Sequence, residues 1–218
     1  YMQMSKIRYR SRVGDLEIPA FVFQPLQLGQ ARSHPALVWV HENIRGHLYE
    51  HYIPFIRQAT AKGYIVIAPE YRGSIGYGQQ LYDAIDYGGA EVDDVVSAVN
   101  VLTLRYAAVD PKRIGIIGWS HGGWTIMDSL ALRTGEEMRR VTGLEDLQGE
   151  PLEGLAATMI VYPYTGVGTY TGHRDWRIAP RSTAIIAQRD YIVGSTRSAL
   201  ERQRARGAPM EILLFENA

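Results

Sequence analysis

Short runs of apolar residues alternate along this chain with segments of helical period. The strand-length runs are ALVWVHE, YIVIAPEY, IGIIGWS, LAATMIVYP, TAIIAQRD and MEILLFEN. Between them the pattern predicts helices around residues 49–62, 91–106, 121–133 and 195–206. Continuous apolar strands that alternate with helices are typical of a mostly parallel sheet with helices on both faces. The pattern therefore predicts a doubly wound α/β fold.

The first part of the chain departs from this alternation. The segment KIRYRSRVGDLEIPAFVFQP alternates in polarity on both sides of Gly14 and Asp15, which predicts an antiparallel hairpin within residues 1–35. Two stretches rich in glycine and tyrosine, 72–90 and 164–181, interrupt the regular pattern. Such excursions beside a rigid sheet are typical of specificity loops and lids. The 218 residues suit a single domain, 1–218, with a sizeable core.

Composition excludes several classes of function. Lys+Arg and Asp+Glu both number 23, so no basic face is indicated and nucleic acid is not expected as a partner. The chain has no cysteine, which excludes thiol catalysis and zinc–thiolate sites within it. No apolar run reaches the length of a membrane span, and the start lacks a signal-peptide core, so we expect no membrane partner and favour the cytoplasm. His47 and His51 flank Glu50 without a third ligand, so no metal site is expected.

The strongest chemical signal is the pentapeptide Gly118-Trp119-Ser120-His121-Gly122. It matches G-x-S-x-G, follows a predicted strand and precedes a predicted helix, which is the context that a nucleophile elbow requires. The glycines permit a tight turn there, and the turn aims the serine hydroxyl into the cleft beyond the strand. Ser120 is therefore the candidate nucleophile, and a helix-capping serine is the alternative.

Two longer segments resemble the α/β-hydrolase superfamily. YRGSIGYGQQLYDAIDYGGAEVDDVVSAVNVL and VDPKRIGIIGWSHGG resemble the hydrolase domain of prolyl oligopeptidase-type serine hydrolases. VWVHENIRGHLYEHYIPFIRQATAKGYIVIAPEY is similar to the dienelactone hydrolase family, although that family has a cysteine where this chain has Ser120. The resemblance implies an α/β-hydrolase fold and a triad in the order serine, acid, histidine.

Asp190 fits the acid of that triad because it ends the strand TAIIAQRD, and Asp175, inside the second excursion, is the rival. The six histidines all precede Asp190. In this superfamily the base follows the last strand, so we expect the base histidine, its loop and the closing helix beyond Ala218. His173 is the internal alternative. The side chain of His121 should point away along its helix and is rejected as the base.

The resemblance also implies an oxyanion hole, and aromatic residues near the strand ends indicate a substrate pocket. The donors of the oxyanion hole are expected to be the backbone N–H groups of His121 and Asn43. Glu42 stands beside Asn43 and is either part of the site or a solvated loop carboxylate. The expected pocket-lining aromatic residues are Trp119, Tyr77, Tyr164 and Trp176.

The expected activity is hydrolysis of small carboxylic esters or lactones through an acyl-enzyme on Ser120, with no cofactor. This preference over a peptidase rests on the short segment before the first core strand, which leaves no room for a propeller in the given chain. A peptidase of prolyl oligopeptidase type is the first alternative. A non-catalytic relative that lacks the base and only binds a ligand is the second.

Overall fold

The computed structural model describes residues 2–131, 152, 154–190 and 193–216. Eight strands form one sheet in the order β1-β2-β4-β3-β5-β6-β7-β8. The strands are β1 (Met2–Arg10), β2 (Glu17–Pro25), β3 (His34–Val40), β4 (Ile65–Pro69), β5 (Val109–Trp119), β6 (Leu155–Val161), β7 (Arg181–Ala187) and β8 (Met210–Phe215). The helices are η1 (Glu50–Tyr52), α1 (Ile53–Ala61), α2 (Gln79–Asp83), α3 (Ala90–Arg105), α4 (His121–Ala131) and α6 (Val193–Ala205).

Strand direction follows the predicted pattern. β1 and β2 form the expected antiparallel hairpin, in which Gly14 takes a positive φ of 66° at the turn. β2 is also antiparallel to β4, whereas every pair from β4 across to β8 is parallel. The prediction of a mostly parallel sheet with an N-terminal hairpin is therefore confirmed, and the carboxyl ends of β3 to β8 meet at one edge of the sheet.

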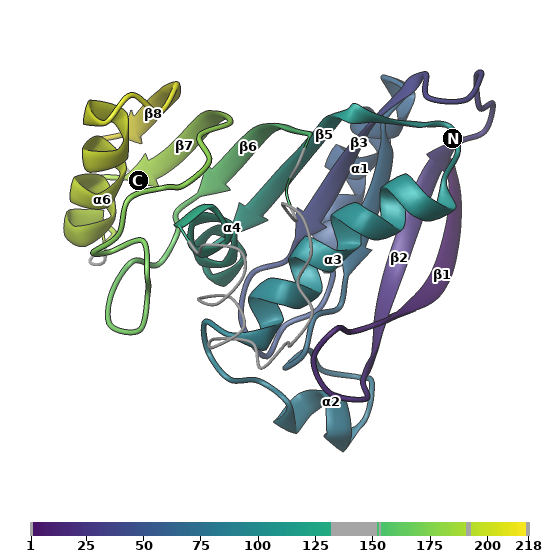
Figure 1. Ribbon diagram of the computed structural model, residues 1–218, viewed down its shortest axis with the longest axis horizontal. Coiled ribbons are helices and arrows are strands. Elements are labelled where there is room, and N and C mark those ends of the chain that lie inside the picture. Colours follow the sequence, from purple (N-terminus) through teal and green to yellow (C-terminus); the bar gives the residue numbers. More distant parts are fainter. Residues whose placement is uncertain (1, 132–151, 153, 191–192, 217–218) are drawn as a thin grey trace.

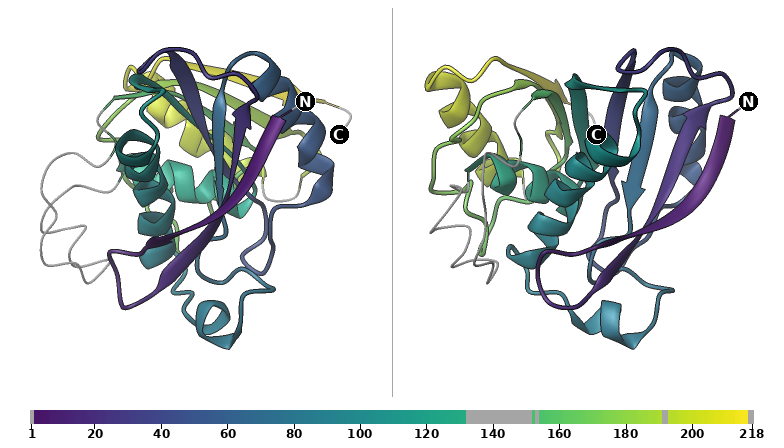
Figure 2. Two further views of the ribbon diagram at one scale, coloured as in Figure 1. Left: turned by 90° about the vertical axis from the view of Figure 1, so that its right-hand side faces the viewer. Right: turned by 45° about the vertical axis from the view of Figure 1, so that its right-hand side comes forward.

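Helices cover both faces of this sheet. Figure 1 shows α3 and α4 in front of the strands and α1 behind them, and the left view of Figure 2 shows α1 and α3 on opposite sides. β3 contributes side chains to the core on both faces of the sheet. Val38 and Val40 belong to the larger buried cluster. Trp39 belongs to the smaller cluster, with Tyr52 and Ile56 on the side of α1. Successive side chains of a strand point to opposite faces, so an unbroken apolar run fills two layers at once.

The helix after the first excursion buries more than its predicted valine face. Val92, Val95, Val96, Val99 and Leu102 are all buried, as the period predicts. Glu91, Asp93 and Asp94 are buried as well, with 0% exposure each. Such burial is tolerated only when partners satisfy the carboxylates.

An ion pair joins α3 to the loop after β4. The guanidinium of Arg72 donates to Asp94 from Nε at 2.7 Å and from Nη2 at 3.0 Å, and its Nη2 also donates to Ser11 Oγ at 2.6 Å. Asp93 pairs with Arg12 of the hairpin turn. These contacts fasten the N-terminal hairpin to the first turn of α3.

Local boundaries differ from the prediction in three places. The predicted helix 49–62 is divided into η1 and α1, with Pro54 in the first turn of α1. The excursion 72–90 contains α2, which at five residues is too short to show a period. β5 starts at Val109, so the expected turn DPKR is part of the strand.

One expectation falls partly outside the described residues. The helix predicted to reach residue 133 is described as far as Ala131. Among the helices that the structure describes, none has both the length and the apolar character needed to cross a lipid bilayer.

Candidate active site

Ser120 occupies the turn between β5 and α4 in a strained conformation. Its φ is +50°, a region that non-glycine residues seldom adopt. The neighbouring glycines cannot be replaced without collision: a Cβ atom on Gly118 would lie 2.7 Å from the backbone of Gly122, and one on Gly122 would lie 2.6 Å from the carbonyl oxygen of Val40. The turn is therefore as tight as the G-x-S-x-G pattern predicts.

The turn is held at both ends by main-chain hydrogen bonds. The N–H of Ser120 donates to the carbonyl of Val161 on β6 at 3.0 Å, and the N–H of Trp124 donates to the carbonyl of Ser120 at 3.0 Å. The serine side chain lies half-buried at the start of α4. Within the described residues, its hydroxyl forms no hydrogen bond, so the oxygen is left for an incoming group.

The loop after β3 lies directly against this turn. Asn43 also has a positive φ, +62°, and its carbonyl accepts hydrogen bonds from Gly46 N–H at 2.9 Å and from the Tyr71 hydroxyl at 3.4 Å. Neither the N–H of Asn43 nor that of His121 donates a hydrogen bond to any part of the chain that the structure describes. Two main-chain donors beside a serine are what an oxyanion hole needs; their assignment to Asn43 and His121 remains a prediction.

Strained residues line up across three neighbouring strands. Asn43, Ser120 and Tyr162 all have positive φ, and each follows the carboxyl end of one strand: β3, β5 or β6. β5 lies between β3 and β6 in the sheet. Non-glycine residues with such φ values cluster at functional sites because the surrounding fold must enforce them. This row therefore marks the sheet edge as the functional one.

Glu42 is bound by tyrosines from two distant segments. Tyr52 donates its hydroxyl to Glu42 Oε2, and Tyr162 donates to the same oxygen at 3.1 Å. The Nε2 atom of His51 lies 3.9 Å from the other oxygen, Oε1. The indole ring of Trp119 packs on the Tyr52 ring at 4.8 Å between centroids. The structure thus brings Glu42 and Trp119 together at the end of β5, next to Ser120.

A layer of buried titratable groups lies behind the oxyanion loop. His41 is stacked on Tyr71, and its Nε2 contacts Ser74 Oγ at 2.9 Å. Burial lowers the pKa of His41 to about 4 and raises the pKa of neighbouring Glu70 to about 7. Burial, and secondarily His41, lowers the pKa of His121 to about 3. An enclosed imidazole with so low a pKa is a weak proton acceptor near pH 7.

The candidate acids differ in their surroundings. Asp190 lies in the turn after β7, where its N–H donates to the carbonyl of Ala187 at 3.2 Å. Asp175 instead faces α6, with its carboxylate 2.8 Å from Arg206 Nε and 3.7 Å from Arg202 Nε. His173 is exposed, and its ring lies 6.3 Å from that of Tyr170. No hydrogen bond joins any described histidine to Ser120.

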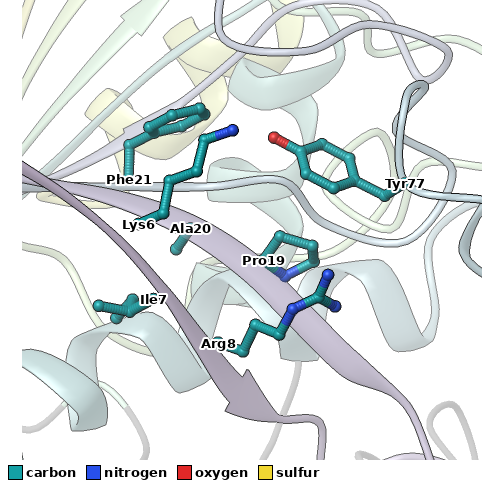
Figure 3. Close-up of a pocket in the computed structure, with 7 residues that line it drawn as sticks. All are labelled: Lys6, Ile7, Arg8, Pro19, Ala20, Phe21 and Tyr77. Atoms are coloured by element: carbon teal, nitrogen blue, oxygen red, sulfur yellow. The ribbon is translucent and has the colours of Figure 1, made fainter.

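The remaining predicted pocket residues are dispersed. The ring of Tyr164 lies 5.5 Å from that of Trp124 on α4. Trp176 is anchored by hydrogen bonds to Thr171 and Gln203 and packs against the main core. Tyr77 lines a groove of about 390 Å³ beside the hairpin, with its hydroxyl pointing toward Lys6 (Figure 3). The structure therefore does not bring Tyr77 and Trp176 together with Glu42 and Trp119.

Two parts of the site escape sequence reasoning. Tyr52 and Tyr162 are separated from Glu42 by 10 and 120 positions, and no motif connects them. Tyr162 lies near the end of the predicted strand LAATMIVYP, and its place at a carboxyl end is the only signal in the sequence. The described residues contain no group of three or more His, Asp or Glu side chains that could hold a metal ion.

The known sequences to which this chain is similar are named as peptidases. Residues 52–137 match the prolyl oligopeptidase family. The chain is 35% identical over 124 residues to the uncharacterized peptidase YuxL of Bacillus subtilis, covering 55% of this chain and 18% of the relative. It is 25% identical over 202 residues to human dipeptidyl peptidase 8, covering 89% of this chain and 20% of the relative. The chain thus spans about a fifth of the length of these curated relatives.

Comparison with solved structures identifies the fold. Puromycin hydrolase superposes with a TM-score of 0.77 at 17% identity, covering 100% of this chain and 36% of that one. Thermogutta terrifontis esterase 2, phosphonylated by cyclosarin, superposes with a TM-score of 0.72 at 16% identity, covering 98% and 83% respectively. These likenesses show that the chain has the α/β-hydrolase fold, as its sequence predicts.

Proposed function

We propose that this chain is the catalytic part of a serine hydrolase of prolyl oligopeptidase type, which cleaves peptide bonds through an acyl-enzyme on Ser120. The observation that carries the proposal is Ser120 itself, held at a φ of +50° in a turn that only glycines can flank. The family match over residues 52–137 includes this turn. The curated relatives that match are named as peptidases.

The proposed reaction follows the geometry of the strand ends. The Ser120 oxygen attacks the scissile carbonyl carbon, and its proton passes to a general base. The carbonyl oxygen, now negative, is stabilised by the N–H groups of Asn43 and His121. The C–N bond breaks, the amine leaves with the proton from the base, and water then hydrolyses the ester on Ser120 by the same steps.

The base and the acid belong to the proposal as well. We assign the base to a histidine that follows β8 beyond residue 218, and Asp190 to the role of orienting it. The absence of a hydrogen bond between Ser120 and any described histidine supports this assignment. The position of Asp190 just after β7 favours it over Asp175, which lies inside the excursion before that strand.

An esterase of small carboxylic esters or lactones is the second candidate. It is supported by the Thermogutta esterase, of which this chain covers 83%. The short segment before β3 does not separate the two candidates, because the chain spans only about a fifth of its peptidase relatives. The resemblance to dienelactone hydrolases stays a prediction of the sequence.

The test is covalent labelling of the full-length protein with a fluorophosphonate probe. Label should appear on Ser120 and should vanish in Ser120→Ala, because the serine oxygen is the reacting atom. Turnover of p-nitroanilides and of p-nitrophenyl esters of one acyl group would then be compared, and the amide activity should be lost with the label. Equal labelling of Ser120→Ala would refute the assignment, and a folded protein without label would be a non-catalytic relative.

A further inference from the structure

The Glu42 carboxylate lies in the same row as the nucleophile. Val40 pairs with Gly118, and Trp119 pairs with Val161, so Glu42, Ser120 and Tyr162 continue one register across β3, β5 and β6. Adjacent strands are about 4.8 Å apart. The Tyr162 hydroxyl spans this row to reach Glu42 Oε2 at 3.1 Å, which places the hydrogen bond across the end of β5.

One oxygen of the carboxylate accepts two hydrogen bonds, and the other has His51 Nε2 at 3.9 Å. Tyr52 and Tyr162 both donate to Oε2. Burial and the neighbouring Glu42 raise the pKa of Tyr162 to about 12, so its hydroxyl stays a donor at neutral pH. Among the described residues, no donor forms a hydrogen bond to Oε1, and no lysine or arginine forms an ion pair with Glu42. The tyrosines thus fix the carboxylate through Oε2, while Oε1, beside His51, keeps its capacity to accept a hydrogen bond.

The surroundings of Oε1 suit a cation. The rings of His51 and Tyr52 lie 4.1 Å apart, and those of Tyr52 and Trp119 lie 4.8 Å apart. Tyr162 is 37% exposed, so the cluster opens to solvent. A carboxylate oxygen next to aromatic faces attracts an ammonium group through both a charge-assisted hydrogen bond and cation–π contact.

We propose that Glu42 binds the free α-ammonium group of the substrate, and that the enzyme therefore acts on peptides and aminoacyl amides with an unblocked N-terminus. In the acyl-enzyme, the α-ammonium lies one carbon atom away from the carbonyl attached to Ser120. A substrate of this kind places its charge beside the nucleophile, in the row that Glu42 shares with Ser120. The inference rests on the proposed acyl-enzyme at Ser120. It limits the substrates to those in which the residue that acylates Ser120 is the N-terminal one.

The experiment compares two substrates of the full-length protein, alanine p-nitroanilide and N-acetylalanine p-nitroanilide. The wild type should have the higher kcat/KM for the unblocked substrate. Glu42→Gln should reduce the ratio of the two kcat/KM values by about tenfold or more, since it removes a charged acceptor. Tyr162→Phe, which loses one donor to the carboxylate, should reduce the ratio less. Glu50→Gln, an exposed carboxylate of η1, is the matched control and should leave the ratio at the wild-type value.

Fluorophosphonate labelling of each variant tests the acyl-enzyme on Ser120 separately from the ammonium site at Glu42. If Glu42→Gln and Tyr162→Phe are labelled at Ser120 but keep the wild-type ratio, the ammonium site is refuted and the acyl-enzyme stands. A wild-type preference for the acetylated substrate would refute the ammonium site too. Absence of label from Ser120 in the wild type would instead refute the proposed function.

Discussion

The turn that carries Ser120 and the excursion that carries Asp175 differ in what holds them. Around Ser120 the backbone of one segment touches the backbone of another: the Cβ of a residue at 122 would overlap the carbonyl of Val40, and β6 accepts the serine N–H. The excursion before β7 is held mainly by side chains of α6, such as Arg202 donating to the carbonyls of Thr171 and Arg174. The nucleophile is thus fixed by main-chain packing, and the excursion depends on side-chain contacts.

Replacement of Asp190 should lower kcat far more than replacement of Asp175. In the full-length protein, Asp190→Asn should lower kcat by about 10⁴-fold, because the base histidine would lose its orienting carboxylate and the stabilisation of its charged form. The thermal midpoint should change little, since the residue is only half-buried in a turn. Steady-state kinetics on a p-nitroanilide, with calorimetry as the folding control, provides the measurement. A decrease in kcat of less than tenfold would show that another residue is the acid of the triad.

The largest stability effect should arise on the Ser120 side. Arg72→Met should cost about 3–5 kcal/mol, because Asp94 would remain charged and buried without its partner. The matched control is Arg10→Met, whose pair with Asp15 is exposed by 75% and 87% and should contribute less than about 1 kcal/mol. Urea unfolding of both variants makes the comparison. Similar losses from the two would show that the buried pair is not what fastens the hairpin to α3.

Glu70 offers a test by pH in the same region. Burial raises its pKa from 4.5 to about 7, so the folded state holds a proton that the unfolded state has released. The contribution of Glu70 to the free energy of unfolding should therefore fall as pH rises from about 4.5 to 7, by at most about 3 kcal/mol. Glu70→Gln keeps an oxygen for the Leu48 N–H and removes the titration. The variant should lose less stability than wild type between pH 5 and pH 8 in urea unfolding.

Sequence reasoning succeeded where a local pattern encodes the structure. The parallel sheet follows from unbroken apolar strands, and the turn at Ser120 follows from glycines at fixed positions. The helix at 91–106 was found from its valines, but the burial of Asp94 was not. Its partners, Ser11 and Arg72, come from separate segments, and a single chain carries no signal for such a pairing.

The same limit applies to the site. The order of the superfamily places Ser120 and Asp190, because each follows a strand. The arrangement of Tyr52 and Tyr162 on Glu42 depends on how three loops meet at the end of the sheet. Tyr77 was grouped with Trp119, Tyr164 and Trp176 for its aromatic character alone, and the fold directs it instead to the groove beside Lys6 and Arg8. The type of a residue indicates what chemistry it can perform, but tertiary contacts determine which residues lie in the same site.

The smallest expected effect sharpens the contrast between the two candidate acids. Asp175→Asn should reduce stability by less than about 1 kcal/mol, because its carboxylate is 44% exposed and its pairs with Arg202 and Arg206 are screened by water. Its kcat should stay within about twofold of wild type, since those pairs fasten the excursion to α6 and leave Ser120 untouched. Kinetics and urea unfolding alongside Asp190→Asn measure both effects. If Asp175→Asn lost activity by orders of magnitude while Asp190→Asn did not, the acid would lie in the excursion, and the order of strand ends would not govern this site.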